Sequence, residues 1–393
     1  MTRCGGIALL FFLFVGRAFA DDLSRTKSDS PVTKLEQIRA IQQGLEWIRN
    51  HQGEDGGWCS INYAPLRPGA GVTARMLALL AELPLDDRKR LAEQYQRGVR
   101  FLLRKFRPGN SAGLLLKDVD YPLYAAAYFL SAQSQVEGER TFDLKPELVH
   151  FLQKQQRLPQ NGWPADRMDV GGWSPWMESP GDVSGQPPAN VSVTCAVLTA
   201  LQQAGGLTDD VKSGAARFLK RCEAPVAGSS RERGMAFTPW PDSPFNKGGT
   251  VTSATGDIQP LAYHSATTDG LRIRKILAAP GEETLPEDVL RTWLQMPRAR
   301  LVGDPEREGE REPLQSALFF YDAAAFGGLW QERTREEKSE NALVVDRARL
   351  LMVLVRSQRE DGSWMNPLPW FFEDDPFIAT PLALSALIRL QSP

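Results

Sequence analysis

Two short runs of carboxylates have the residue types and spacing for acid-base or cation chemistry. Asp118 and Asp120 form the first run, and Asp374 and Asp375 follow Glu373 in the second. Neighbouring carboxylates can hold a proton on one member or bind a hard cation such as Ca²⁺. Each run also precedes an apolar helical segment, where an acidic side chain caps a helix start and compensates the helix dipole. Both interpretations stay open.

A further group of candidates surrounds His264, one of three histidines in the sequence. A histidine titrates near neutral pH and can act as a general acid or base. The same polar cluster, placed at the start of an expected helix, would also satisfy free backbone N–H groups. A second aromatic and acidic stretch follows in residues 318–322. The candidate cavity residues are Tyr263, His264, Ser265, Asp269, Tyr321 and Asp322, together with Asp118, Asp120, Asp374 and Asp375.

The cysteines give no sign of a metal centre. Cys59, Cys195 and Cys222 form no CxxC pair and have no metal-ligand spacing to a histidine. We therefore predict no metal site and no cofactor. One disulfide with one free thiol, or three buried thiols, both fit the sequence.

The elements that must position these residues are pairs of helices. In each pair an amphipathic helix leads through a turn or loop to a second, more apolar and alanine-rich helix. Because the first helix must cover the second, an outer ring of helices around an inner ring is the economical arrangement. The expected pairs are residues 37–51 with 72–83, 95–105 with 121–132, 146–156 with 191–204, 211–222 with 267–279, 287–295 with 314–326, and 347–358 with 378–390.

A closed ring competes with an open helical solenoid. Similar pairs stand at opposite ends of the chain, and the final helix is as apolar as the internal ones. An open array needs polar capping helices at its ends. The pattern therefore favours an all-α fold that closes into an α/α toroid.

A glutamine, glycine and tryptophan motif recurs at the turns. The glutamine can bond backbone groups, the glycine permits a positive φ, and the tryptophan covers a large apolar area. We interpret the motif as structural. Its copies are Gln52, Gly56 and Trp58, then Gln156, Gly162 and Trp163, and finally Gln358, Gly362 and Trp364.

This QW motif resembles the repeat of squalene-hopene cyclases, oxidosqualene cyclases and protein prenyltransferase β-subunits. The resemblance implies a terpenoid cyclase/prenyltransferase-like α/α toroid whose functional residues line a cavity. The chain departs from these families in chemistry: it has no DxDD acid, no prenyltransferase zinc set and no GCGEQ thioester. The segment 263–271 is similar to one in uncharacterised exported proteins of this repeat group, in which a histidine is usual where Asp322 stands.

The amino terminus predicts export. Residues 1–20 combine a basic start, an apolar run and a small-residue end, as a secretory signal peptide does. A polar linker over residues 21–32 and a single toroid domain over 33–393 follow. We expect a secreted or periplasmic protein without stable membrane insertion after cleavage, and the net charge of −2 suggests no nucleic-acid partner.

The sequence leaves function open between three classes. The leading hypothesis is a cavity that binds a small apolar or amphipathic molecule, or another exported protein. The alternatives are a diverged enzyme, active on isoprenoids or polysaccharides, and a protein-interaction scaffold. An apolar cavity would favour the small-molecule hypothesis. Converging carboxylates would favour a sugar or metal ligand, and a centre filled by side chains would favour the scaffold. The long loops 164–190 and 225–259 are expected to fold over one face as lids or partner surfaces.

Overall fold

The computed structural model describes most of the expected toroid domain. The described residues are 31–109, 114–136, 144–177, 180, 187–229, 231–253, 255–279, 287–296, 298–301, 313–334 and 341–391. The expected signal peptide, residues 1–20, and the linker up to residue 30 lie outside them. Within the described residues, no helix has both the length and the apolar character needed to cross a membrane.

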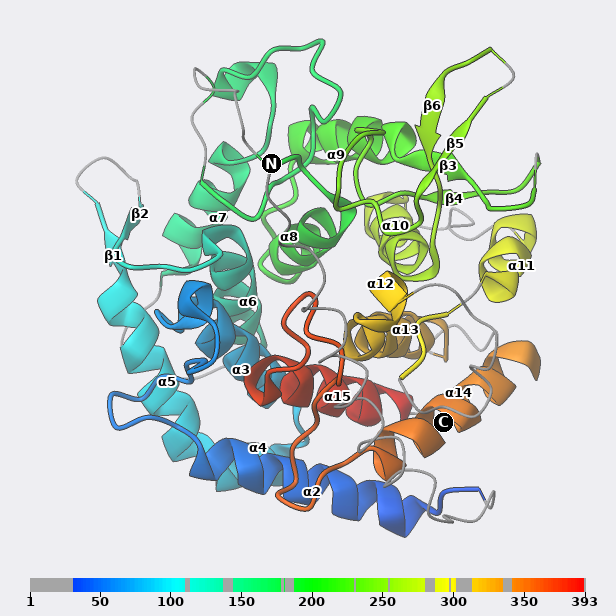
Figure 1. Cartoon of the computed structure of the whole chain (residues 1–393). Coiled ribbons are helices and arrows are strands. Elements are labelled where there is room, and N and C mark those ends of the chain that lie inside the picture. The colour runs from blue at the N-terminus through cyan, green and yellow to red at the C-terminus, as the bar shows by residue number, and fades with distance from the viewer. Residues whose placement is uncertain are drawn as a thin grey trace, which may run out of the picture.

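Six helix pairs in the described residues form two concentric rings (Figure 1). The expected pairs are all present, although the fifth inner helix begins later than predicted, after the separate short helix α12 (Pro313–Ser316). The inner helices are α3 (Ala70–Glu82), α6 (Pro122–Gln135), α8 (Val191–Gln203), α10 (His264–Leu277), α13 (Phe319–Thr334) and α15 (Pro376–Leu390). The outer helices are α2 (Lys34–Asn50), α5 (Ala92–Lys105), α7 (Lys145–Lys154), α9 (Asp209–Arg221), α11 (Glu287–Gln295) and α14 (Asn341–Arg356).

Local signals set several helix starts. Thr33 and Glu36 form a capping box at α2, in which each side chain bonds the other residue's backbone N–H. Asn190 and Thr208 cap α8 and α9 through their side-chain oxygens. The sequence therefore determines where these helices begin before any packing is considered.

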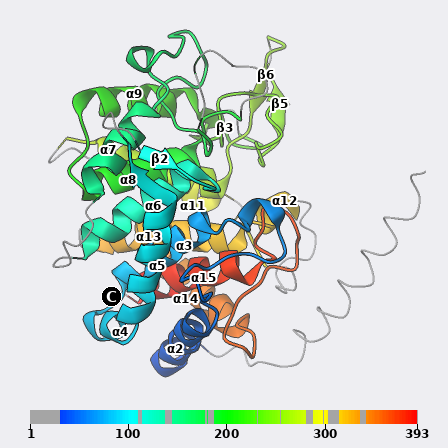
Figure 2. The ribbon, with the colours of Figure 1, turned by 90° about the vertical axis from the view of Figure 1, so that its left-hand side faces the viewer.

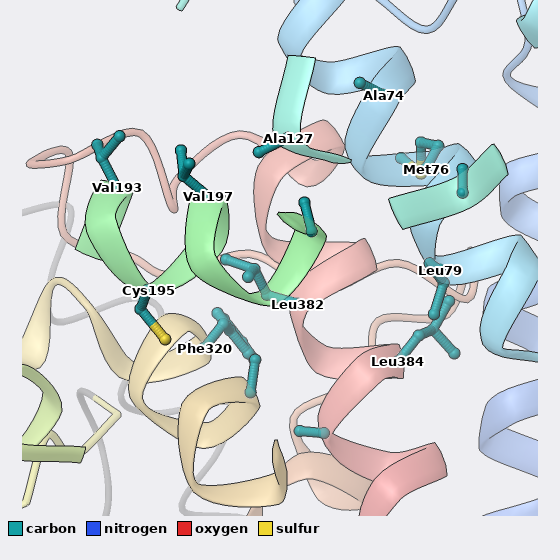
Figure 3. Packing of buried hydrophobic residues seen from close by; sticks show 14 of the residues in the cluster. Ala74, Met76, Leu79, Ala127, Val193, Cys195, Val197, Phe320, Leu382 and Leu384 are labelled. Atoms are coloured by element: carbon teal, nitrogen blue, oxygen red, sulfur yellow. The ribbon is translucent and has the colours of Figure 1, made fainter. Parts of the chain in front are cut away.

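The inner helices pack through small and branched apolar side chains. Figure 3 shows Ala74, Met76, Val197, Leu382 and others meeting between α3, α6, α8, α13 and α15. These side chains belong to one continuous core of fully or nearly fully buried residues. Burial of this kind is the main stabilising term of the fold.

The ring is closed. Each inner helix contacts the next, and α15 returns to contact α3. The outer ring closes as well, because Gln358, at the end of the last outer helix, donates a 2.8 Å hydrogen bond to the Ala40 carbonyl in α2. The prediction of closure over an open solenoid is confirmed.

The glutamine and tryptophan side chains join neighbouring pairs as expected of a structural motif. Gln52 Nε2 donates to the carbonyls of Gly56, in its own turn, and of Gln94, in the next outer helix. Trp58 is fully buried and its indole N–H donates to the Ile48 carbonyl. Gln358 and Trp364 repeat this arrangement at the end of the chain.

The third copy of the motif corrects the sequence interpretation. Gln156 Nε2 donates to Gly171 and to Val211 in α9, and the indole that bonds back to the preceding helix is that of Trp173. Gly162 and Trp163 are therefore not the motif residues. An insertion separates the glutamine from its glycine, so spacing alone selected the wrong pair. Trp163 instead lies under the Arg157 and Arg167 guanidinium groups.

Among the described residues, three short antiparallel hairpins, which the sequence did not predict, lie in the connections between helices. β1 (Phe106–Pro108) pairs with β2 (Leu114–Leu116), β3 (Glu223–Pro225) with β4 (Arg233–Met235), and β5 (Thr250–Thr252) with β6 (Ile258–Pro260). Figure 2 shows β5, β6 and α12 on one side of the ring, and the short helix α4 (Leu85–Arg90) with the carboxyl end on the other. The described parts of the long loops lie with the former, over the amino-terminal ends of inner helices.

A buried lysine holds the loop 225–259 against the segment that precedes α15. Lys247, in loop 225–259, is only 8% exposed, and its ammonium lies 4.0 Å from the Phe237 ring centroid and 4.6 Å from that of Phe371. Its Nζ donates to the Phe245 carbonyl. Burial lowers the pKa of Lys247 to about 7. The loop is thus held to the segment that precedes α15 by cation–π contacts.

Candidate active site in the central cavity

The centre of the ring contains a cavity of about 610 Å³, a size that suits a small ligand. All of the inner helices contribute to its wall. The wall is rich in hydroxyl, amide and charged groups. These polar lining residues include Arg75, Glu82, Tyr128, Ser131, Gln135, Ser192, Thr199, Gln202, Gln203, Asp269, Arg272, Lys275, Tyr321, Gln331, Glu332 and Arg389.

The cavity opens at the carboxyl-terminal ends of the inner helices. Gln202 and Gln203, in the last turn of α8, are exposed lining residues, whereas Asp269 is 1% exposed. Asp269 therefore belongs to the floor. The described loop segments cover the opposite ends of the helices, so they do not form a lid over this mouth, which corrects one expectation from the sequence.

Asp269, Tyr321 and Ser192 converge on the floor from three different helices. The Tyr321 hydroxyl donates a 2.6 Å hydrogen bond to Asp269 Oδ2, and Ser192 donates to the same oxygen at 3.1 Å. Neither donor bonds Oδ1. Both donors bond Oδ2, and no hydrogen bond to Oδ1 is made among the described residues.

The environment tunes this carboxyl group. Burial raises the pKa of Asp269 to about 6, against the opposing effects of the Tyr321 hydrogen bond, the Arg272 charge and the Ser192 hydrogen bond. A carboxyl with a pKa near the working pH is suited to donate or accept a proton. The sequence named Asp269 and Tyr321 as candidates, and the structure places both on the cavity wall.

Most of the charged groups on the wall are paired. Arg389 makes two hydrogen bonds to the Glu82 carboxylate, at 2.6 and 3.1 Å. Arg272 Nε lies 3.4 Å from Glu332 Oε1. Gly328 leaves room for this arginine, since a Cβ there would stand 3.1 Å from the guanidinium carbon. Both carboxylates are thus engaged by arginines.

Arg75 differs from these cations. Its guanidinium donates to the Ser385 hydroxyl at 2.9 Å and lies 5.0 Å from the Tyr128 ring centroid, and both partners are neutral. Its Nε has no hydrogen-bond partner among the described residues. Neither Arg75 nor Arg272 was singled out from the sequence. For Arg75 the available signal was an arginine within a largely apolar inner helix, whereas α10 carries several charged residues beside Arg272.

His264 and Asp322 form a buried pair outside the cavity wall. His264 Nδ1 lies 2.6 Å from Asp322 Oδ1, and the imidazole stacks on Trp293. Burial alone would raise the pKa of Asp322, but His264 and Arg298 hold it below its ordinary value. The neighbouring Tyr263 and Ser265 are likewise buried around the start of α10. The arrangement is that of a buried, hydrogen-bonded structural pair.

The two acidic runs cap helices. Asp120 accepts hydrogen bonds from the Ala70 and Gly71 N–H groups of α3, and Asp375 accepts from Phe377 N–H in α15. Glu373 accepts from two N–H groups at the start of α13, and burial raises its pKa to about 8. The capping interpretation describes these residues, and two of them cap a helix other than the one they precede.

The remaining members of the runs lie apart from the cavity. Asp118 is exposed at a positive φ of 49°, and Asp374 accepts a hydrogen bond from the Tyr63 hydroxyl. The predicted acidic residues therefore do not converge with Asp269. Among the described residues, no group of three or more histidine, cysteine or acidic side chains is placed to hold a metal ion.

The three described cysteines are free thiols. Cys195 and Cys222 are buried and Cys59 is partly buried. Burial raises the pKa of Cys195 to about 12 and that of Cys59 to about 11. Although Cys195 lines the cavity, it is a poor nucleophile because so little thiolate forms.

No family model matches the chain, and no curated protein matches its sequence. Solved structures do match the fold. The type II terpene cyclase MstE from Scytonema is 12% identical with a TM-score of 0.55, over 92% of this chain and 99% of that one. The GH76A α-1,6-mannanase from a Salegentibacter species is 12% identical with a TM-score of 0.56, over 91% and 99%.

Cellobiose 2-epimerase from Bacillus thermoamylovorans is a third match, 11% identical with a TM-score of 0.51 over 89% of this chain and 98% of that one. At these identities the likeness establishes the fold alone. The chain therefore has the α/α toroid architecture, which terpene cyclases share with carbohydrate-active enzymes.

Proposed function

We propose that the protein is an enzyme that takes a small, hydroxyl-rich molecule of the carbohydrate class into the central cavity. The observation that carries the proposal is Asp269, held on the cavity floor by Tyr321 and Ser192 through one oxygen only. The other oxygen is positioned to exchange a proton with a bound molecule. Asp269 would act as the general acid or base.

The pKa of Asp269 sets the direction of transfer. Since it is raised to about 6, the carboxyl donates a proton below that pH and accepts one above it. The other wall carboxylates, Glu82 and Glu332, are engaged by arginines. A reaction that needs one acid-base group, such as epimerisation or elimination, is therefore favoured over hydrolysis by two free carboxylates.

The wall chemistry favours a sugar over an apolar ligand. An apolar or amphipathic molecule, the leading hypothesis from the sequence, would cover hydroxyl, amide and guanidinium groups without bonding them. Each polar group left unpaired in this way costs about 1–3 kcal/mol. A sugar offers hydroxyl groups that bond such a wall. Fold likeness to a mannanase and an epimerase is consistent with this choice.

The cavity also bears on the scaffold alternative. A ring that serves only as a docking surface needs no polar cavity, and this centre is not filled by side chains. Export, predicted from residues 1–20, would bring the protein to polysaccharides outside the cytoplasm. We therefore include a secreted or periplasmic location in the proposal.

The test compares the wild-type protein with Asp269→Asn. Purified protein is incubated with cellobiose and α-1,6-mannotriose between pH 4 and 8, and products are followed by NMR and mass spectrometry. We expect turnover by the wild type and a loss of at least about 100-fold in Asp269→Asn, as for removal of a general acid or base.

The matched control is Asp257→Asn, an identical change at an exposed aspartate beside β6. It should leave turnover and its pH profile unchanged. If Asp269→Asn is as active as the wild type, the assigned role is wrong. If no sugar is bound or converted and native mass spectrometry instead finds a retained isoprenoid, the carbohydrate proposal is wrong.

A further inference from the structure

Cationic side chains outnumber carboxylates among the described residues of the cavity wall. Its described residues include four cationic side chains, Arg75, Arg272, Lys275 and Arg389, against three carboxylates, Glu82, Asp269 and Glu332. Two arginines are matched by Glu82 and Glu332, as described above. Lys275 donates to the Glu332 backbone carbonyl and has a further contact, so Arg75 is the cation whose partner has to be sought.

Arg75 has no ion pair of its own, although its charge, after that of Arg389, helps to lower the pKa of Glu82 against the effect of burial. No described carboxylate lies within ion-pair distance of it, and its contacts are the neutral Ser385 hydroxyl and Tyr128 ring. Arg75 stands in the middle of α3, away from the carboxyl-terminal turn where the helix dipole stabilises a cation. A partly enclosed guanidinium without a directly bonded anion is better stabilised when a ligand supplies a negative charge in contact with it.

The residues around Arg75 leave it presented to the cavity. The Tyr128 ring supports the guanidinium through a cation–π contact, and Ser385 fixes one amino group. An arginine held in this way is pre-organised to bind a carboxylate with two parallel hydrogen bonds. The nearby polar wall remains available for hydroxyl groups.

We propose that the ligand of this cavity is an acidic sugar, and that Arg75 binds its carboxylate. The inference rests on the proposed function and narrows its substrate class to uronic acids. Arg272, across the ring on α10, adds attraction while its own charge stays paired with Glu332. The cationic wall would also steer an anionic sugar toward the mouth.

Glucuronate and glucose are the probes, because they differ only in a carboxylate at C6. Titration calorimetry at one pH and low ionic strength measures both affinities, with inorganic phosphate as a third probe. We expect the wild type to prefer glucuronate by about 10-fold or more, the scale of one charge-assisted pair. Arg75→Gln should lose this preference and keep its affinity for glucose.

Arg274→Gln is the matched control, since it removes the same charge from α10 at a residue paired with Glu223 outside the cavity. It should behave as the wild type. Arg75→Lys retains the charge and should retain part of the preference, which guards against a folding defect in Arg75→Gln. Thermal unfolding of each variant checks that it is folded.

The outcomes separate the two proposals. Equal binding of glucose and glucuronate by the wild type overturns the acidic-sugar inference and leaves the carbohydrate proposal standing. Binding of phosphate without glucuronate overturns it in favour of a phosphorylated ligand. If neither sugar binds, both proposals fail. If Arg75→Gln still prefers glucuronate over glucose, Arg75 does not bind the carboxylate.

Discussion

At the scale of single residues, the titratable group with the most suggestive sequence context is not the one that reaches the cavity. His264 is one of three histidines and stands in a polar cluster, yet its ring is stacked on Trp293 and paired with Asp322. Asp269 lies five positions later, on the cavity side of the same helix. Packing determines which face of a helix points into the cavity, and the periodicity of the sequence does not reveal that face.

Lys247 provides a residue-scale prediction of pH dependence. Its pKa falls to about 7 in the folded protein from an ordinary value of 10.5. Between these values the unfolded chain holds a proton that the folded chain has released, so stability rises with pH in this window. We expect the free energy of unfolding of Lys247→Met to exceed that of the wild type by about 1 kcal/mol at pH 6, and by less at pH 9.

Guanidinium chloride unfolding at the two pH values measures this effect. Lys89→Met, at an exposed lysine of α4, is the control and should unfold as the wild type does. A constant difference between Lys247→Met and the wild type at both pH values would contradict the assignment. A loss of stability at pH 6 would mean that the aromatic contacts outweigh the cost of burying the charge.

At the scale of elements, the helices were predictable and the connections were not. Periodicity located every helix pair, because amphipathic and apolar segments differ strongly in composition. The third motif failed because its glycine and tryptophan, Gly171 and Trp173, come after an insertion that sequence spacing cannot represent. The hairpins were not predicted because strands of three residues carry almost no periodic signal.

The corrected motif predicts unequal effects of two alanine substitutions. Gly171 and Gly162 both have positive φ, 95° and 91°. A Cβ on Gly171 would stand 2.0 Å from the Gly214 carbonyl oxygen, whereas a Cβ on Gly162 meets only Pro180, at 3.1 Å. We expect Gly171→Ala to cost about 3 kcal/mol or more and Gly162→Ala about 1 kcal/mol.

Chemical denaturation of both variants gives the comparison, and each serves as the other's control. Equal destabilisation would show that the backbone conformation alone matters. A larger loss of stability in Gly162→Ala would mean that Gly162, as first predicted from the sequence, is the glycine of the motif.

At the scale of the whole molecule, closure distinguishes this chain from an open repeat array. In an open array each repeat contacts only its neighbours, so a terminal repeat can be removed and the rest stays folded. Here α15 packs against both α13 and α3, and therefore supports the first repeat as well as the last. Closure could be predicted because the first and last helix pairs are similar in sequence. The identity of the ligand could not, because it depends on individual cavity side chains that do not repeat.

Removal of residues 341–393 tests this property. Without α14 and α15, the apolar faces of both α3 and α13 are exposed, and we expect no cooperative thermal transition by circular dichroism. Gln358→Ala is the comparison: it removes one closing hydrogen-bond donor and should keep a single transition, with a loss of about 1–2 kcal/mol. A cooperative, helical truncated protein would show that the ring behaves as an open array.

Two helices are capped by residues that lie later in the chain, and this has a consequence for folding during synthesis. The start of α3 is satisfied by Asp120, and that of α13 by Glu373, so each helix awaits a residue made after it. Asp375, at the start of the last helix, also bonds Ser60 in the first repeat. Until α15 has been made, the first repeat lacks its contacts with that helix, and α13 lacks both α15 and its Glu373 cap. We expect the emerging chain to remain incompletely folded until its final helix has been released.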